Sequence, residues 1–141
     1  MLKTEIKSIS AKDTLSIRQQ VMWPDKDIFY VELSEDPRGL HYGFLVDGIL
    51  ISVVSLFENK DGWQFRKFAT LQKEQGKGYG SKLLRYVLTV AERKKATKIY
   101  CNARVEKINF YRSFGLIPTD KTFVKGGIPY VVMEKKVTRI S

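Results

Sequence analysis

Arg66-Lys-Phe-Ala-Thr-Leu-Gln-Lys-Glu-Gln-Gly-Lys-Gly-Tyr-Gly-Ser-Lys-Leu-Leu84 is the stretch of the chain that decides the fold. An apolar run typical of a strand ends at Leu71, glycines stand at 76, 78 and 80, and the pattern of an amphipathic helix follows at once. The glycines leave backbone N–H groups uncovered where a helix begins and where its dipole is positive. Such a turn binds anions, so the sequence predicts a phosphate-binding loop here.

Two well-known glycine-rich loops do not fit this spacing. The dinucleotide-binding pattern G-x-G-x-x-G requires a third glycine where this chain has Ser81. The Walker A pattern also fails, because no glycine precedes a Lys-Ser or Lys-Thr pair at the required distance. What remains is Gln75-x-x-Gly78-x-Gly80 between a strand and a helix.

A second segment makes the pattern more specific. It reads Cys101-Asn-Ala-Arg-Val-Glu-Lys-Ile-Asn-Phe-Tyr-Arg-Ser-Phe-Gly-Leu-Ile-Pro118 and predicts a strand, a short helix with a Phe-Tyr pair, and a glycine stop. The two segments, in this order, resemble motifs of the GNAT family of N-acetyltransferases, whose coenzyme A loop reads Gln or Arg-x-x-Gly-x-Gly or Ala. The resemblance covers residues 40 to 136 well and the N-terminal third loosely.

The resemblance implies an enzyme that moves an acetyl group from acetyl-CoA, a co-substrate, directly to an amine acceptor in a ternary complex. Backbone amides from Gly76 to Ser81 are expected to hold the pyrophosphate, and the end of the preceding strand is expected to pair with the pantetheine arm. Asn102 either bonds the pantetheine or caps the next turn. The implied cofactor-binding residues are Phe68, Ala69, Thr70, Gln75, Gly76, Lys77, Gly78, Tyr79, Gly80, Ser81 and Asn102.

Tyr111 matches the family tyrosine that lies near the cofactor sulfur, so the resemblance implies that it protonates the departing thiolate. A phenol with a pKa of about 10 can donate to a thiolate whose conjugate acid has a pKa of about 8.5, when the two are held together. Alternatively, Tyr111 is a core residue whose hydroxyl lies at the edge of the core.

The general base is not identified by the sequence. Many family members carry a glutamate on the strand before the loop, but the charged residues between Asp61 and Glu74 are all basic here. Glu32, His41 and Glu58 are open alternatives, as is a water relay. Arg66 and Lys67 would favour an acceptor with a carboxylate or a phosphate, or strand alternation leaves one of them in solvent. Trp23 and Trp63 either line an acceptor pocket or belong to the core, and Cys101 is expected to be a buried structural thiol.

Composition sets the broad class. The 141 residues, 43% hydrophobic and 12% aromatic, predict one globular domain over residues 1–141. No apolar run is long enough to span a bilayer, no signal-peptide pattern opens the chain, and the one cysteine suits a reducing compartment, so we expect a cytoplasmic protein without membrane association. No metal-ligand spacing is present, and we expect no metal.

The expected elements place the motifs in a mixed α/β (α+β) fold. The order is strand, helix, three strands, helix, strand, helix and two strands, which matches a GNAT-like, mostly antiparallel central sheet flanked by helices. Expected strands are 2–9, 41–46, 49–57, 63–71, 98–102, 121–124 and 130–135; expected helices are 11–22, 78–95 and 106–114. Asp47-Gly48 is a strong hairpin signal between two of the strands.

The net charge of +10 motivates one of two competing functions. A basic nucleic-acid-binding domain would explain the charge but leaves the glycine loop unexplained, so we do not expect a nucleic-acid partner. A catalytically degenerate module that binds coenzyme A as a sensor or partner is the other alternative, which the missing strand glutamate keeps open. The expected partner is a small-molecule or peptide amine acceptor. Acceptor identity, acyl-chain preference and the choice between a monomer and a homodimer are not predicted.

Overall fold

A computed structural model describes residues 1–137 of the chain. These residues form a seven-stranded sheet with the order β1-β2-β3-β4-β5-β7-β6, in which only β4 and β5 pair in parallel. The strands are β1 (Thr4–Ile9), β2 (Leu40–Val46), β3 (Ile49–Asn59), β4 (Gly62–Thr70), β5 (Lys98–Arg104), β6 (Ile117–Lys125) and β7 (Ile128–Lys136). The α-helices are α1 (Ala11–Met22), α2 (Tyr79–Arg93) and α3 (Ile108–Arg112). The predicted mixed, mostly antiparallel fold is confirmed.

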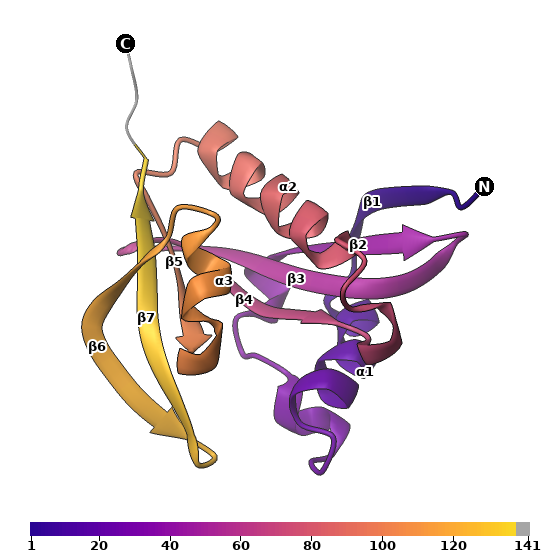
Figure 1. The fold of residues 1–141 in the computed structure, drawn as a ribbon, viewed down its shortest axis with the longest axis horizontal. Helices are drawn as coiled ribbons and strands as arrows, with labels where there is room; N and C mark the ends of the chain where they lie inside the picture. The colour runs from indigo at the N-terminus through magenta and orange to yellow at the C-terminus, as the bar shows by residue number, and fades with distance from the viewer. Residues whose placement is uncertain (138–141) are drawn as a thin grey trace.

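The helices lie on both faces of the sheet (Figure 1). The buried face of α2, with Leu83, Leu84 and Val87, packs on β2 to β5 in the larger hydrophobic core, against which α3 also packs. On the other face, Ile17 of α1 packs against Val53 and Ala69 in a smaller core. The sheet is therefore covered on both sides in its middle, and β1 and β6 form its edges.

Local sequence signals set several element ends. A capping box starts α1, because the Ser10 hydroxyl accepts from Asp13 N–H while the Asp13 carboxylate accepts from Ser10 N–H. The β2–β3 turn has positive φ angles of 50° at Asp47 and 80° at Gly48, which are the angles of the two-residue turn that the Asp-Gly pair predicts.

Three predicted boundaries near the C-terminal half are wrong. The strand expected to stop at Asn102 continues to Arg104, and the helix expected over 106–114 is shorter, with the 3-10 turn η4 (Val105–Lys107) ahead of α3. The strand expected from Lys121 begins at Ile117 and includes Pro118. A proline is tolerated there because β6 is an edge strand. The polar segment 25–39 also holds two 3-10 turns, η1 (Ile28–Val31) and η2 (Asp36–Arg38).

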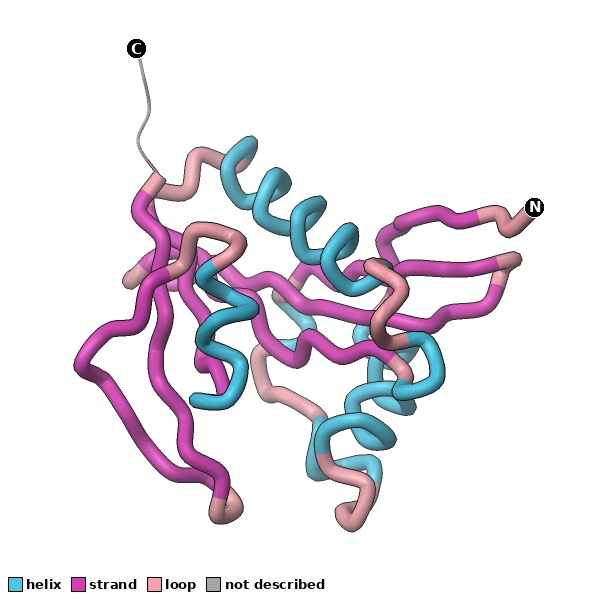
Figure 2. The backbone as a smooth tube through the Cα atoms, viewed as in Figure 1, coloured by secondary structure: helices cyan, strands magenta, loops and turns pink. Residues whose placement is uncertain are grey.

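Two irregularities of β4 open the sheet at its centre (Figure 2). The β4–β5 register holds only two pairs, Trp63 with Ile99 and Gln64 with Tyr100, after which the strands diverge. On its other edge, the register of β4 against β3 shifts opposite Val54, and Lys67 has a φ of 55°. This is a β-bulge, a feature that bends a strand and redirects its side chains.

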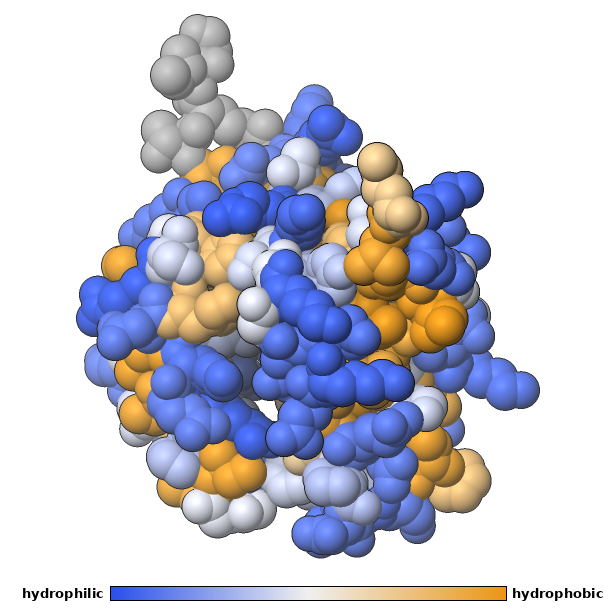
Figure 3. Space-filling model, turned by 45° about the vertical axis from the view of Figure 1, so that its right-hand side comes forward, coloured by the Kyte–Doolittle hydropathy of each residue, from blue (hydrophilic) through white to orange (hydrophobic). Residues whose placement is uncertain are grey.

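The surface is mixed in character. On the face shown in Figure 3, hydrophobic side chains form separate groups between broad hydrophilic areas. Among residues 1–137, no helix is both long and apolar enough to cross a membrane.

Candidate functional site

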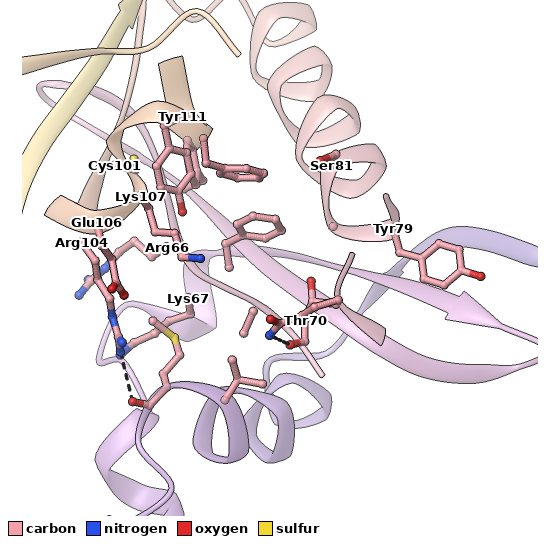
Figure 4. A pocket seen from close by; sticks show the side chains of 18 of the residues that line it. Arg66, Lys67, Thr70, Tyr79, Ser81, Cys101, Arg104, Glu106, Lys107 and Tyr111 are labelled. Carbon is pink, nitrogen blue, oxygen red and sulfur yellow. Dashed lines mark hydrogen bonds between the residues drawn. The ribbon is translucent and has the colours of Figure 1, made fainter. Parts of the chain in front are cut away.

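A cavity of about 510 Å³ lies where β4 and β5 diverge. Its walls come from β4, the loop before α2, the end of β5, α3 and the C-terminal end of α1 (Figure 4). Eleven of the twelve residues predicted for the site line it: Phe68, Ala69, Thr70, Gln75, Gly76, Gly78, Tyr79, Gly80, Ser81, Asn102 and Tyr111. Lys77 does not line it, and its ammonium lies 3.1 Å from the Glu74 carboxylate.

The glycine-rich loop exposes backbone N–H groups at one end of this cavity. Gly78 is the N-cap of α2, and no side chain caps the helix. Within the described part of the chain, no hydrogen bond uses the N–H of residues 76 to 81. Gly76 and Gly78 have φ angles of 80° and 83°, and a Cβ on either would meet no atom within 4 Å. Both positions need glycine for the backbone conformation, and both leave open space for a ligand.

Gly80 is required for a different reason. A Cβ at Gly80 would lie 2.8 Å from Thr70 Oγ1 and 3.2 Å from Phe68 Cζ, so glycine allows α2 to begin close against the end of β4. The Gln75 side chain closes the loop by donating to the Thr70 carbonyl at 2.9 Å. Tyr79 offers only its backbone to the cavity: its ring stacks on Phe44 at 4.9 Å and points away in Figure 4.

Tyr111 reaches the cavity from α3. Its ring lies 5.8 Å from that of Phe65 and 5.2 Å from that of Phe110. Burial raises the pKa of Tyr111 well above its usual value. The phenol therefore keeps its proton at neutral pH, as a proton donor must.

The three carboxylate and imidazole alternatives for a general base do not line the cavity. His41 is buried, with Nδ1 at 2.7 Å from Ser55 Oγ and Nε2 at 2.9 Å from the Asp36 carbonyl, and is part of the structure between β2, β3 and η2. Glu32 and Glu58 are exposed elsewhere. Within residues 1–137, the carboxylates that line the cavity are Glu74 and Glu106. The sequence did not single out Glu106, because the divergence of β5 from β4 that leaves Glu106 beside the cavity is a tertiary feature.

A smaller cavity of about 70 Å³ adjoins the first and shares lining residues with it, Lys67 and Asn102 among them. Trp23 lines this smaller cavity, whereas Trp63 belongs to the core. Cys101 is buried, and burial raises the pKa of its thiol well above the usual value, as expected for a structural cysteine.

Other lining residues were not predicted by the sequence. Arg104, Lys107 and Tyr130 reach the cavity because β5 and β7 curve away from β4. No residue pattern in the sequence pointed toward them. In the described part of the chain, no group of three or more His, Cys, Asp or Glu side chains is arranged to hold a metal.

Comparisons with known proteins indicate the family of the chain. A sequence profile described as "Acetyltransferase (GNAT) domain" matches residues 19–137. The chain is 27% identical to the uncharacterized N-acetyltransferase YitI of Bacillus subtilis, over 97% of this chain and 98% of the relative.

Solved structures share the fold. An acyl-CoA N-acyltransferase from Pseudomonas aeruginosa matches with a TM-score of 0.77 and 18% identity, over 96% of this chain and 99% of the other. A GNAT family acetyltransferase from Elizabethkingia anophelis, solved with acetyl-CoA bound, matches with a TM-score of 0.72 and 17% identity, over 95% and 98%. The chain therefore belongs to the GNAT acetyltransferase family.

Proposed function

We propose that the whole chain acts as one cytoplasmic domain that transfers an acetyl group from acetyl-CoA to an amine. Family membership supports N-acetyltransferase activity in general. The observation that carries the specific proposal is the continuity of the cavity: uncovered N–H groups of residues 76–81 stand at one end and the Tyr111 phenol further along it.

The residues fit coenzyme A in their chemistry. The free N–H groups at the start of α2, aided by the helix dipole, would hold the pyrophosphate. The edge of β4 left unpaired beyond Gln64 would donate and accept backbone hydrogen bonds along the pantetheine arm, at Phe68 to Thr70. Asn102, exposed on the opposite wall, would bond the same arm.

The transfer needs one proton acceptor and one proton donor. After the acceptor ammonium gives one proton to the base, its nitrogen would bond to the acetyl carbon, the bond from that carbon to sulfur would break, and Tyr111 would give its phenolic proton to the thiolate. The second proton that the nitrogen must lose to become an amide would return to the Tyr111 phenolate, directly or through water. Glu106 is the proposed proton acceptor, directly or through water. Glu74 is held by Lys77, whereas no hydrogen bond or ion pair to another described residue engages Glu106.

Thermal unfolding with acetyl-CoA, coenzyme A and ATP tests the cofactor assignment. A ligand at about one hundred times its Kd adds about 2.7 kcal/mol to the free energy of unfolding and raises Tm by several degrees. Both coenzyme A forms should raise Tm and ATP should not, and release of free thiol should follow addition of an amine. A folded protein whose Tm does not respond to either form would refute the proposal. Stabilisation without thiol release from any amine would indicate a module that binds coenzyme A without catalysis.

A further inference from the structure

We propose that the acceptor is an amine that also carries an anionic group, a carboxylate or a phosphate, and that Lys67, Arg104 and Lys125 hold this group beside Trp23. The inference rests on the proposed function and names its substrate class. It comes from the smaller cavity, which lies at the opposite side of the site from the glycine-rich loop.

The lining of the smaller cavity is basic and aromatic. Its residues are Met22, Trp23, Phe65, Arg66, Lys67, Asn102, Phe123, Lys125 and Tyr130. None of them is acidic, and three carry a positive charge. A polyamine or another polycation would meet repulsion here, whereas an anion would be attracted.

Two carboxylates of the segment that holds η2 are already engaged. Glu35 accepts from Arg66 Nη1 at 2.6 Å, which neutralises that guanidinium. Asp36 is bound by both terminal nitrogens of Arg18, at 2.8 and 2.9 Å. In contrast, no hydrogen bond or ion pair to a described residue engages Lys67 Nζ, so its charge is available to a ligand.

Two further cations flank the ring of Trp23. The Arg104 guanidinium and Lys125 Nζ each lie 5.9 Å from the ring centre. Lys125 Nζ also lies 5.7 Å from the ring of Tyr30. Arg104 is oriented by a 3.3 Å hydrogen bond to the Met22 carbonyl, drawn in Figure 4. Contacts to ring faces leave N–H donors of both cations free for an oxygen ligand.

These positive charges are crowded. Burial, followed by the charges of Lys125, Arg66 and Arg18, lowers the pKa of Lys67 to about 8, and Asp36 opposes this only in part. The bulge holds Lys67 in the left-handed region, a conformation that a non-glycine residue adopts at a cost. A bound anion would offset the repulsion that the fold builds in at this point.

The position of the charges suits the transfer. The two cavities share Met22, Phe65, Arg66, Lys67, Asn102 and Tyr130, so a molecule anchored in the smaller one extends into the larger one. Phe65 also packs against Tyr111. An acceptor whose anion lies beside Lys67 would therefore direct its amine toward Tyr111 and the unpaired edge of β4.

Matched acceptors test the proposal. Thiol release is measured with glycine, L-leucine and L-phenylalanine, each against its own amide, and with phosphoethanolamine against ethanolamine; spermidine is the polycation. We expect kcat/KM for at least one anionic amine to exceed that of its neutral partner by about tenfold or more. The first three pairs report on a carboxylate and the fourth on a phosphate.

Variants locate the effect. Lys67→Met and Lys125→Met remove charge but keep most of each side-chain stem, and should lower the anionic preference mainly by raising KM. Lys12→Met, at an exposed position of α1 that lines neither cavity, is the matched control and should leave the preference unchanged.

The failure of this inference differs from failure of the proposed function. If acetyl-CoA stabilises the protein but no anionic amine is preferred over its neutral partner, the acceptor class is wrong and the acetyltransferase proposal stands. A preference that persists in both lysine variants would also overturn the assignment to this cavity. If coenzyme A does not bind at all, the proposed function itself fails.

Discussion

Arg18 and Asp36 form a two-pronged ion pair inside the protein, with Nη1 to Oδ2 at 2.8 Å and Nη2 to Oδ1 at 2.9 Å. The Arg18 side chain is fully buried and also donates to the Val31 carbonyl and to Ser55 Oγ. The pair thus joins α1 to η1, η2 and β3, and β3 is the strand that pairs with β4 at the Lys67 bulge. Moving both charges out of water costs free energy, so a buried ion pair adds little net stability. We therefore infer that the pair serves to fix these segments relative to one another.

Asp36→Asn should therefore destabilise the protein strongly. The change leaves the Arg18 guanidinium buried without its counter-charge, and loss of one partner of such a pair costs about 3–5 kcal/mol. Asp61→Asn, in the exposed β3–β4 turn, is the matched control and should change stability by less than about 0.5 kcal/mol. Urea unfolding of the two variants measures the difference. Equal stabilities would contradict the role given to the pair.

The same carboxylate predicts acid sensitivity. Burial alone would raise the pKa of Asp36, but hydrogen bonds from Arg18 and from Leu33 N–H, with the charge of Arg18, outweigh it, and the pKa is lowered. A carboxyl with a lowered pKa in the folded state stabilises the protein fully above its unfolded pKa of about 3.9, and this stability is lost as pH falls through the folded value. Acid unfolding should begin at higher pH in Asp36→Asn than in the native protein.

Gly78→Val should abolish coenzyme A binding while leaving the protein folded. A valine there adopts a left-handed conformation, at a cost of about 1–2 kcal/mol, and places its side chain in the open space at the start of α2. Gly48→Val is the matched control, because Gly48 also has a φ of 80° with open space around it but lies in the β2–β3 turn. Calorimetric titration with coenzyme A should separate the two. Retained binding by Gly78→Val would mean that this loop does not hold the pyrophosphate.

Tyr111→Phe should keep the affinity for coenzyme A and lower kcat. The ring contacts with Phe65 and Phe110 remain, but the proton that the thiolate takes is gone. General acid catalysis contributes about 10²–10⁴-fold, so a decrease of about 100-fold or more is expected. Titration gives the affinity and thiol release gives kcat. An unchanged kcat would remove the donor role from Tyr111.

Glu106→Gln should lower kcat/KM at neutral pH and make kcat/KM rise more steeply with pH. If the Glu106 carboxylate takes the proton of the acceptor, the substitution should matter less at high pH, because the amine is already neutral there. Glu106→Asp should restore part of the activity at neutral pH. A pH profile identical to that of the native enzyme would exclude this residue as the base.

Lys67 should make the affinity for an anionic product depend on pH. N-acetyl-L-phenylalanine carries a carboxylate and no amine, so its own charge is constant between about pH 6 and 10. The pKa of Lys67 is about 8, set by burial and by Lys125, Arg66, Arg18 and Asp36 around it, so its positive charge is present below this value and lost above it. Affinity should fall as pH rises through 8 in the native protein and stay flat in Lys67→Met. The same decrease in both would assign the effect to another group.

The glycine-rich loop could be predicted from sequence because its signals are local. Gly76 and Gly78 have no side chain to cover their backbone N–H groups, and the helix that follows has a clear apolar periodicity. The Asp47-Gly48 turn is similar, since two adjacent residues determine its angles. In each case the residues that decide the structure are neighbours in the chain.

The proposed acceptor side of the site depends on contacts between distant segments. Lys67 lies in a bulge that no residue pattern announces, and Lys125, Arg104 and Trp23 come together from β6, β5 and the end of α1. Glu106 lines the cavity because β5 diverges from β4 after two register pairs. The strand predicted over 98–102 is too short because Ala103 and Arg104 extend it by pairing with β7, which is also a contact between distant segments.

The short junction between β4 and β5 has a consequence for cooperativity. Strands β1 to β4 and strands β5, β7 and β6 form two blocks of sheet that share only two register pairs. Such blocks are natural units of local opening, each with its own free energy of hydrogen exchange. A molecule that lies in the cavity between β4 and β5 and forms hydrogen bonds to both strands would join the two blocks as an added strand does. Amide protons far from the cavity, at the outer edges β1 and β6, would then exchange more slowly together.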